Sequence, residues 1–527
     1  MVASNSLFRA DELVGRWFSA PLSFANRVRI RTRERFVRDL LHVREGDCLD
    51  DEPIAASLRN LRALEFIARA EAAVVAREDS TAELRISVWD AWSTSLGLTA
   101  SVENGVQLQG LSVAERNLFG RGLKAAVHFY DYRERRDAGA DVRAARVFGT
   151  DATAHIRGGS TRTGHYGGVG LSQPFRSERS RNFLDAAFWY EDREHGWATG
   201  QSNVTRVLLP VADRRAQLTA YRRHGLPGQL SLIGGELSLV HRTVAGPARA
   251  VSNGDFDLAP AASASLATEL GRQAAPPSAI QVGGSIGSRR IRYVEAVGLD
   301  LVHGVQDVAT GSDVVATVGR AVGTFNSGPF YSYGWVDAYT GLHRGRWTAV
   351  SRLRIGGRHL DSRRSASDRS RWRDIQVDGN GQVTLTIPGV VQQAVVVATT
   401  IKSFGHADQF SQTVLSGYGA IRGYENDRLP VARFVLVTLE HRANPPVVHP
   451  ALGVGTTLFF DAGRGWAGDI PFGMHTGWRA AFGSGLRFGI PARSGANARV
   501  ELAWPIASGS LGRPIIRTYV VALSGRR

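Results

Sequence analysis

Residues 451–463, "ALGVGTTLFFDAG", alternate between two kinds of side chain along their whole length. The first set is mostly apolar and consists of Leu452, Val454, Thr456, Leu458 and Phe460. The second set is small or polar, apart from one ring, and consists of Gly453, Gly455, Thr457, Phe459 and Asp461. Strict alternation with a period of two predicts a β-strand with one apolar and one polar face.

The neighbouring stretches alternate in the same way, at 431–442, 476–490, 498–504 and, less cleanly, 515–524. Three features favour a membrane barrel over a soluble sandwich. The segments have about ten residues, the length that a tilted strand needs to cross a bilayer. The polar face carries glycine and arginine, which suit a wet lumen. Aromatic residues near strand ends (Trp478, Trp504 and Tyr519) suit the two membrane interfaces.

The same alternating, glycine-rich pattern extends back to about residue 96. We expect ten or eleven further strands between 96 and 412, with hairpin turns at 102–105, 251–254 and 377–382. The arginine- and serine-rich stretch 360–374 predicts a long solvated loop. The fold class is therefore mainly β, a transmembrane antiparallel barrel over residues 94–527.

Residues 24–93 predict a small α+β domain with the order β-α-α-β-β. A strand is expected at 24–32, with Thr32 as the N-cap of the helix that follows. A second helix at 50–64 opens with acidic residues and a proline, and two strands follow it. Residues 1–23 are a segment of uncertain role, and they show neither the basic start nor the apolar core of a signal peptide.

The chain has 527 residues and a formal net charge of +16, and its only lysines are Lys124 and Lys402. Its arginines are scattered along strand-like segments and form no basic helix or tail, so we expect no nucleic-acid partner. The single cysteine, Cys48, allows no intrachain disulfide and does not indicate a compartment. No apolar run reaches the roughly 18 residues of a membrane-spanning helix.

Several motifs, in the right order over nearly the whole chain, resemble the superfamily of BamA, TamA and the TpsB transporters of two-partner secretion. "GYGAIRGYE" resembles its lumenal loop motif, and "FFDAGRGW" resembles its F-x-D-x-G strand motif. The residues that match are Gly417, Gly419, Ile421, Arg422, Gly423 and Tyr424 in the loop, and Phe459, Asp461 and Gly463 in the strand. Residues 114–122 and 483–506 resemble the first barrel strands and the glycine-rich penultimate strands.

The resemblance implies a barrel of about 16 strands preceded by one POTRA domain, whose turn and core are Gly46, Asp47, Leu61 and Phe66. It also implies that the loop 404–430 folds into the lumen, where Arg422 would pair with Asp461. The glycines would let the loop approach the wall, and Tyr424 would contact the barrel interior. Unlike many such barrels, the chain does not end its last strand on an aromatic residue.

The sequence predicts no enzyme, cofactor or metal site. "GGSIG" matches a nucleophile-elbow pattern around Ser285, but it lies between strand signals without a helix, so a barrel strand is the better interpretation. His441 and His449 lack ligand spacing, and Asp90 and Trp92 are interpreted as packing residues that close the N-terminal domain.

The resemblance implies an outer-membrane protein with a periplasmic N-terminal domain that inserts barrels or translocates polypeptides. Its partners would be unfolded outer-membrane or secreted clients, the lipid bilayer, and periplasmic or lipoprotein accessory factors. A passive pore, a surface-binding barrel and a soluble arginine-rich β-protein remain as alternatives.

Overall fold

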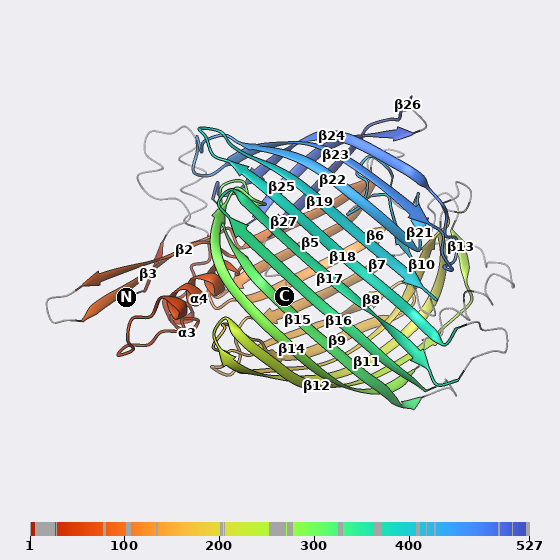
Figure 1. The fold of residues 1–527 in the computed structure, drawn as a ribbon, viewed down its shortest axis with the longest axis horizontal. Coiled ribbons are helices and arrows are strands. Elements are labelled where there is room, and N and C mark those ends of the chain that lie inside the picture. Colours follow the sequence, from red (N-terminus) through yellow and green to blue (C-terminus); the bar gives the residue numbers. More distant parts are fainter. Residues whose placement is uncertain are drawn as a thin grey trace.

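The computed structural model describes residues 2–5, 27, 29–76, 81–101, 107–132, 135–200, 204, 206–251, 270, 278–324, 330–362, 370–406, 412–417, 419–425, 428–493, 496–507 and 510–522. These residues form a large closed barrel and a small sheet with two helices, which stands beyond one end of the barrel strands (Figure 1). Among them, no helix is both long and apolar enough to cross a membrane.

The described residues of the N-terminal unit form a three-stranded sheet and two helices. Its elements are β1 (Val2–Asn5), α3 (Glu34–Asp39), α4 (Asp51–Arg62), β2 (Ile67–Ala76) and β3 (Ala82–Asp90). The sheet order is β1-β3-β2, with β1 parallel and β2 antiparallel to the central strand. The first strand is therefore Val2–Asn5, and the prediction of a strand at 24–32 was wrong for the residues described there, since Arg29 and Ile30 lie in no strand.

Thr32 was predicted to cap α3, but it does not, because its hydroxyl is hydrogen-bonded to Asp90. The N-cap is Arg33, which makes no side-chain cap, and Thr32 Oγ1 donates to Asp90 2.5 Å away. Asp90 is buried and also pairs with Arg29, while Trp92 is partly exposed. The cap of α4 is Asp50, whose carboxylate accepts from the Glu52 amide.

The core of this unit lies between the helices and the sheet. Leu61 is fully buried and Phe66 nearly so, and they pack with Phe36, Val37 and Val88. Gly46 has a left-handed backbone (φ +91°), and the Asp47 carboxylate accepts from the Arg44 amide, so both lie in the turn that the sequence predicted.

The barrel is antiparallel and, in the part of the chain that the structure describes, contains twenty strands of eight or more residues. They are β4 (Thr94–Ser101), β5 (Gln107–Leu118), β6 (Leu123–Tyr132), β7 (Arg135–Ala144), β8 (Thr153–Thr161), β9 (His165–Gln173), β10 (Asn182–Ala198), β11 (Arg206–Leu226), β12 (Gln229–Val244), β14 (Ala279–Val297), β15 (Val305–Thr324), β16 (Tyr331–Arg344), β17 (Trp347–Leu360), β18 (Trp372–Ile387), β19 (Gln392–Gly405), β22 (Arg433–Asn444), β23 (Gly453–Trp466), β24 (Gly477–Gly489), β25 (Ala496–Ala507) and β27 (Ile515–Ala522). Short pieces are β13 (Arg249–Val251) and β26 (Ser510–Leu511), and β20 (Thr413–Val414) pairs with β21 (Pro430–Val431) apart from the barrel.

The barrel class agrees with the prediction, but the strand count of about 16 was too low. The error lies in residues 94–173, where strands of 8–12 residues follow one another closely. The turn expected at 377–382 was also wrong, because those residues lie inside β18 and pair with strands on both sides. The turn expected at 102–105 and the middle of the loop 360–374 lie outside the described residues, as do residues 252–254 of the turn expected at 251–254, whereas Val251 ends β13.

The faces alternate as the sequence predicted. Along β23, residues 453–461 alternate between buried and exposed, with Val454, Leu458 and Phe460 outward and Phe459 and Asp461 inward. Large apolar side chains are exposed on the outer face of strands around the ring, among them Val127, Ile233, Ile286, Val318, Leu353, Leu458 and Trp478. A closed sheet with an apolar outer belt is the surface that a bilayer requires, so this is a transmembrane barrel.

Candidate functional site

The connection between β19 and β22 turns back into the barrel and packs against its inner wall. Gly417 (φ +94°) and Gly419 (φ +78°) have left-handed backbones that only glycine adopts readily. Leu415 and Ile421 are fully buried and pack with Phe434, Leu436 and Ala481, side chains of the wall. The described residues of this loop therefore lie against the inner wall of the barrel.

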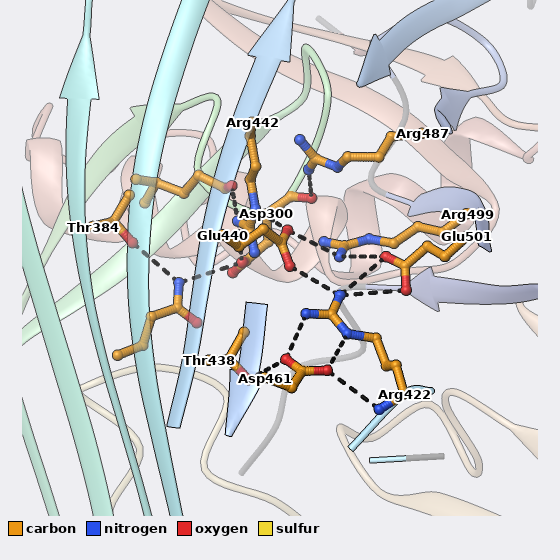
Figure 2. A network of polar contacts seen from close by, with 12 residues as sticks. Asp300, Thr384, Arg422, Thr438, Glu440, Arg442, Asp461, Arg487, Arg499 and Glu501 are labelled. Carbon is orange, nitrogen blue, oxygen red and sulfur yellow. Dashed lines mark hydrogen bonds and ion pairs between the residues drawn. The ribbon is translucent and has the colours of Figure 1, made fainter. Parts of the chain in front are cut away.

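Arg422 is the centre of the polar contacts that hold the loop (Figure 2). Its Nε and Nη2 each donate to one oxygen of Asp461, both at 2.8 Å, and its backbone N–H donates to the same carboxylate at 3.2 Å. Its Nη1 contacts Glu440 and Glu501, each at 3.3 Å. One guanidinium thus bridges β22, β23 and β25, and its planar fork matches the carboxylate of Asp461.

The surroundings of Arg422 are nearly dry. Its side chain is 12% exposed, and those of its three carboxylate partners are between 0% and 5% exposed. The guanidinium carbon also lies 3.4 Å from the centroid of the Phe459 ring, which adds a cation–π contact. Burial by itself lowers the pKa of Arg422, but the hydrogen bonds and charge of Asp461, and then the charges of Glu501 and Glu440, raise that pKa above its ordinary value.

The remaining motif residues fit the loop against the wall. A Cβ on Gly423 would lie within 2.7–2.9 Å of Pro505, Ala481 and Trp504, so only glycine allows this approach. Gly463 plays the same part from the other side, because a Cβ there would meet Leu415 at 3.0 Å and Ile421 at 3.3 Å.

Two further contacts join the loop to the last strands of the barrel. Tyr424 Oη donates to the carbonyl of Ile506 on β25 at 2.8 Å. Arg517 on β27 donates through Nε to the carbonyl of Arg422 at 2.6 Å, and through Nη2 to that of Tyr424. The loop is therefore fastened to four strands, of which β27 closes the barrel against β4.

Further arginines contact the carboxylates that surround Arg422. Arg442 pairs with Glu440 at 2.6 Å and with Asp300 at 3.1 Å, and Arg499 pairs with Glu440 at 3.3 Å. The alternation predicted for 431–442 and 498–504 puts Glu440 and Arg442, and likewise Arg499 and Glu501, on the polar face of their strands. It did not predict that they form one network, because alternation gives a face and not the neighbours across the lumen.

Asp300 belongs to a second inward segment, 298–304 between β14 and β15, which sequence reasoning missed. Leu301 is fully buried and Val302 nearly so. The carbonyls of Leu299 and Asp300 accept hydrogen bonds from Arg442 and Arg487. The sequence "GLDLVHG" contains an indication of this burial, because three large apolar residues are unusual in a solvated turn between two strands.

The N-terminal unit is fixed to the same end of the barrel. Arg62 of α4 donates to Asp307 at 2.6 and 3.1 Å and to Glu295 at 2.7 Å. Asn117 Nδ2 donates to Thr32 Oγ1 at 2.9 Å, and the Arg33 amide donates to the Gly120 carbonyl at 3.0 Å. The stretch 114–122, which resembles the start of the first barrel strands, is thus one of the places where the unit contacts the barrel.

The residues that could suggest other chemistry have ordinary surroundings. Ser285 lies within β14, is buried, and its hydroxyl is 2.7 Å from that of Thr317. His441 contacts Gln393 at 2.9 Å. Within the described ranges, no group of three His, Cys, Asp or Glu side chains is placed to hold a metal ion.

Comparison with known proteins finds no family model and no curated protein sequence that matches this chain. Among solved structures, BamA from Haemophilus ducreyi lacking POTRA domains 1–3 is 12% identical, with a TM-score of 0.37 and coverage of 93% of this chain and 82% of that chain. CdiB from Acinetobacter baumannii is 11% identical, with a TM-score of 0.43 and coverage of 94% and 72%. CdiB from Escherichia coli is 10% identical, with a TM-score of 0.45 and coverage of 93% and 73%. At these identities and TM-scores the likeness assigns no function to this chain.

Proposed function

We propose that this protein lies in the outer membrane, with its N-terminal unit in the periplasm, and inserts other β-barrels or translocates polypeptides. The proposal includes no catalytic step and no cofactor. The observation that carries it is the contact of Arg422 with Asp461, Glu440 and Glu501, which holds a loop inside the lumen. The motif resemblance in the loop and in β23 supports the same reading.

In this proposal the N-terminal unit is a POTRA domain that receives unfolded clients. Its strand β2 lies at one edge of the three-stranded sheet, and Val74 and Val75 near its end are exposed. An extended client could pair with such an edge through main-chain hydrogen bonds, which tolerate many sequences. Accessory proteins of the periplasm could use the same edge.

Within the barrel, the loop around Arg422 acts as a lock, which means that its contacts with the wall hold the barrel in the conformation that handles clients. Removing the guanidinium leaves Asp461 buried without its main partner, which costs roughly 3–5 kcal/mol when the site is dry. Arg517 connects this lock to β27, and the strands β27 and β4 that close the barrel have only eight residues each in the described ranges. Opening between these two short strands, or passage through the polar lumen, would let a client through.

The test uses the full chain refolded into liposomes, with heat-modifiable migration as the check that the barrel has formed. The measurement is the rate at which an unrelated barrel client becomes protected from protease. We expect acceleration by the parent, and roughly a hundredfold less or weaker still by Arg422→Ala and by Asp461→Ala, because each factor of ten corresponds to about 1.4 kcal/mol and one disrupted buried pair costs about 3 kcal/mol or more.

Arg428→Ala is the matched control, because Arg428 lies in the same loop but pairs with Glu425 at the surface, where the side chains are 51% and 59% exposed. It should behave like the parent. Full acceleration by folded Arg422→Ala protein would contradict the role of the lock. No acceleration by the parent would contradict the proposed function itself.

A passive pore is the second candidate, and the wall of β16 and β17 favours it. There the inward side chains of Arg354 and Asp337 are 52% and 53% exposed, which indicates water in that part of the lumen. A folded parent that conducts ions across a planar bilayer, yet leaves client insertion unchanged, would support this candidate.

A further inference from the structure

A groove on the outer face of the barrel contains two arginines whose side chains point away from the lumen. It is open, has a volume of about 290 Å³, and is formed by Gly228, Gln229, Arg290, Arg292, Thr310 and Gly311. It lies across β11–β12, β14 and β15. From this groove we infer a binding site for the phosphodiester group of an anionic phospholipid.

The direction of the two arginines follows from the alternation of β14. Val282, Ile286 and Val294 are exposed on the outer face, and residues 290 and 292 share their parity. The inward residues between them differ sharply, because Ile291 is 1% exposed and Arg289 pairs with Glu178 and Asp313. Among the described residues, Arg290 and Arg292 are exposed and neither has a carboxylate partner.

The height of the groove follows from the register. Ile233 of β12 lies opposite Ile286 of β14, and both are more than half exposed, so this row belongs to the apolar belt. One step toward the N-terminal unit, Ser231 lies opposite Ser288, and the next outward residue on β14 is Arg290. The outer face therefore changes from apolar to small polar to basic within four residues, as at the boundary between acyl chains and head groups.

The groove faces the leaflet on the side of the N-terminal unit. Tyr293, next to Arg292 but on the inner face, lies under the guanidinium of Arg59 of α4 at 4.2 Å. Arg62 of the same helix reaches Glu295 and Asp307. If that unit is periplasmic, as proposed above, this leaflet is the one that carries phospholipids.

The chemistry of the groove suits one phosphodiester. Two guanidinium groups on alternate residues, with Cα atoms about 7 Å apart, can donate to phosphate oxygens from two sides. The Gln229 amide can add a third donor, whereas the Thr310 hydroxyl already donates to the carbonyl of Arg292 at 3.2 Å. Gly228 and Gly311 leave the floor open, and the neighbouring apolar belt receives the acyl chains of a lipid but offers nothing to a free ion.

The test is competitive lipid retention by the full chain. Purified protein in detergent is mixed with equal amounts of palmitoyl-oleoyl phosphatidylglycerol and phosphatidylcholine, and the retained lipids are counted by native mass spectrometry. We expect phosphatidylglycerol to be preferred, and the preference to fall about tenfold or more in R290Q/R292Q, since each basic residue near a membrane surface contributes measurably. R290K/R292K should keep part of it.

R320Q is the matched control, because Arg320 is also on the outer face, on β15, but lies at the other end of the barrel and pairs with Asp361. The inference is overturned if the parent shows no preference, if R320Q lowers it as much as R290Q/R292Q, or if millimolar inorganic phosphate displaces the lipid completely. The first of these needs no variant, so it decides the matter even if a variant fails to fold. The test requires no client, so its outcome is independent of the insertion assay.

Discussion

At the scale of single residues, arginines and carboxylates from distant parts of the chain form ion pairs in the lumen. Arg422 has three carboxylate partners, so alone it would leave an excess of negative charge in a nearly dry space. Arg442 and Arg499 offset this excess through Glu440, and Asp300 in turn accepts from Arg442. Each of the four carboxylates therefore has at least one arginine neighbour, whereas Arg487 donates to the Asp300 carbonyl and to Asn444.

Asp300 allows a pH test of this network. Burial by itself raises the pKa of Asp300, but the charge and hydrogen bonds of Arg442 lower it below its ordinary value of 3.8. A depressed carboxylate pKa stabilises the fold above pH 3.8, and this stabilisation disappears as the pH falls through the folded-state pKa. We therefore expect Asp300→Asn to lower the free energy of unfolding at pH 7 by about 1 kcal/mol, because the Asp300 side chain is 34% exposed and water weakens its pair with Arg442.

The measurement is urea unfolding of parent and variant in detergent between pH 7 and the most acidic condition tolerated. The difference between them should shrink below pH 3.8. Asp361→Asn, at a surface pair with Arg320, should differ little from the parent at any pH. A difference for Asp300→Asn that does not change with pH would contradict the charge pairing.

At the scale of elements, the N-terminal unit and the 298–304 segment lie at the same end of the barrel. Arg62 of α4 pairs with Asp307, at the start of the strand that leaves this segment, and Asp300 within it pairs with Arg442 in the lumen. A chain of ion pairs and backbone thus runs from the helix to the network around Arg422. Such continuity permits coupling between the N-terminal unit and the lumen.

We expect Arg62→Gln to loosen the N-terminal unit from the barrel. Arg62 is 13% exposed and Asp307 17% exposed, so the substitution leaves the Asp307 carboxylate without its arginine partner in a partly buried interface. Hydrogen exchange of α4 and of the start of β15 should increase, and 1 M salt should have a similar effect on the parent, because the screening length then falls to about 3 Å. Arg85→Gln, at an exposed pair within the same unit, is the control and should change neither segment.

The elements also show where sequence reasoning succeeds. Alternation identified the strands of the last hundred residues and their two faces, because it reports directly which side chains meet lipid. It failed for the first strand of the N-terminal unit, since Val2–Asn5 is too short to show a period. It also failed for 377–382, where a turn-like sequence is held as strand by hydrogen bonds to both neighbours.

At the scale of the whole molecule, the motif resemblance and the geometry contribute different information. The resemblance pointed to Arg422 and Asp461 although 39 residues separate them, and the structure brings the two together. Neither the resemblance nor alternation could reveal Asp300, because its partners lie across the lumen and depend on how the barrel closes. The strand count failed for a related reason, since spacing alone does not distinguish short strands with tight turns from long strands with loops.

The outer belt supplies the prediction that separates a membrane barrel from a soluble one. Ile286 on β14 is 66% exposed and lies midway along the outer face between Arg290 and Val282, which is opposite Arg320, whereas Val390 in the turn between β18 and β19 is 87% exposed. In water, an arginine at either position would be nearly neutral. In a bilayer, Ile286→Arg should lower the free energy of unfolding by about 2–4 kcal/mol, whereas Val390→Arg should have little effect because the turn lies outside the apolar belt. Reversible unfolding in phospholipid vesicles measures both, and equal stabilities for the two variants would mean that lipid does not cover this face.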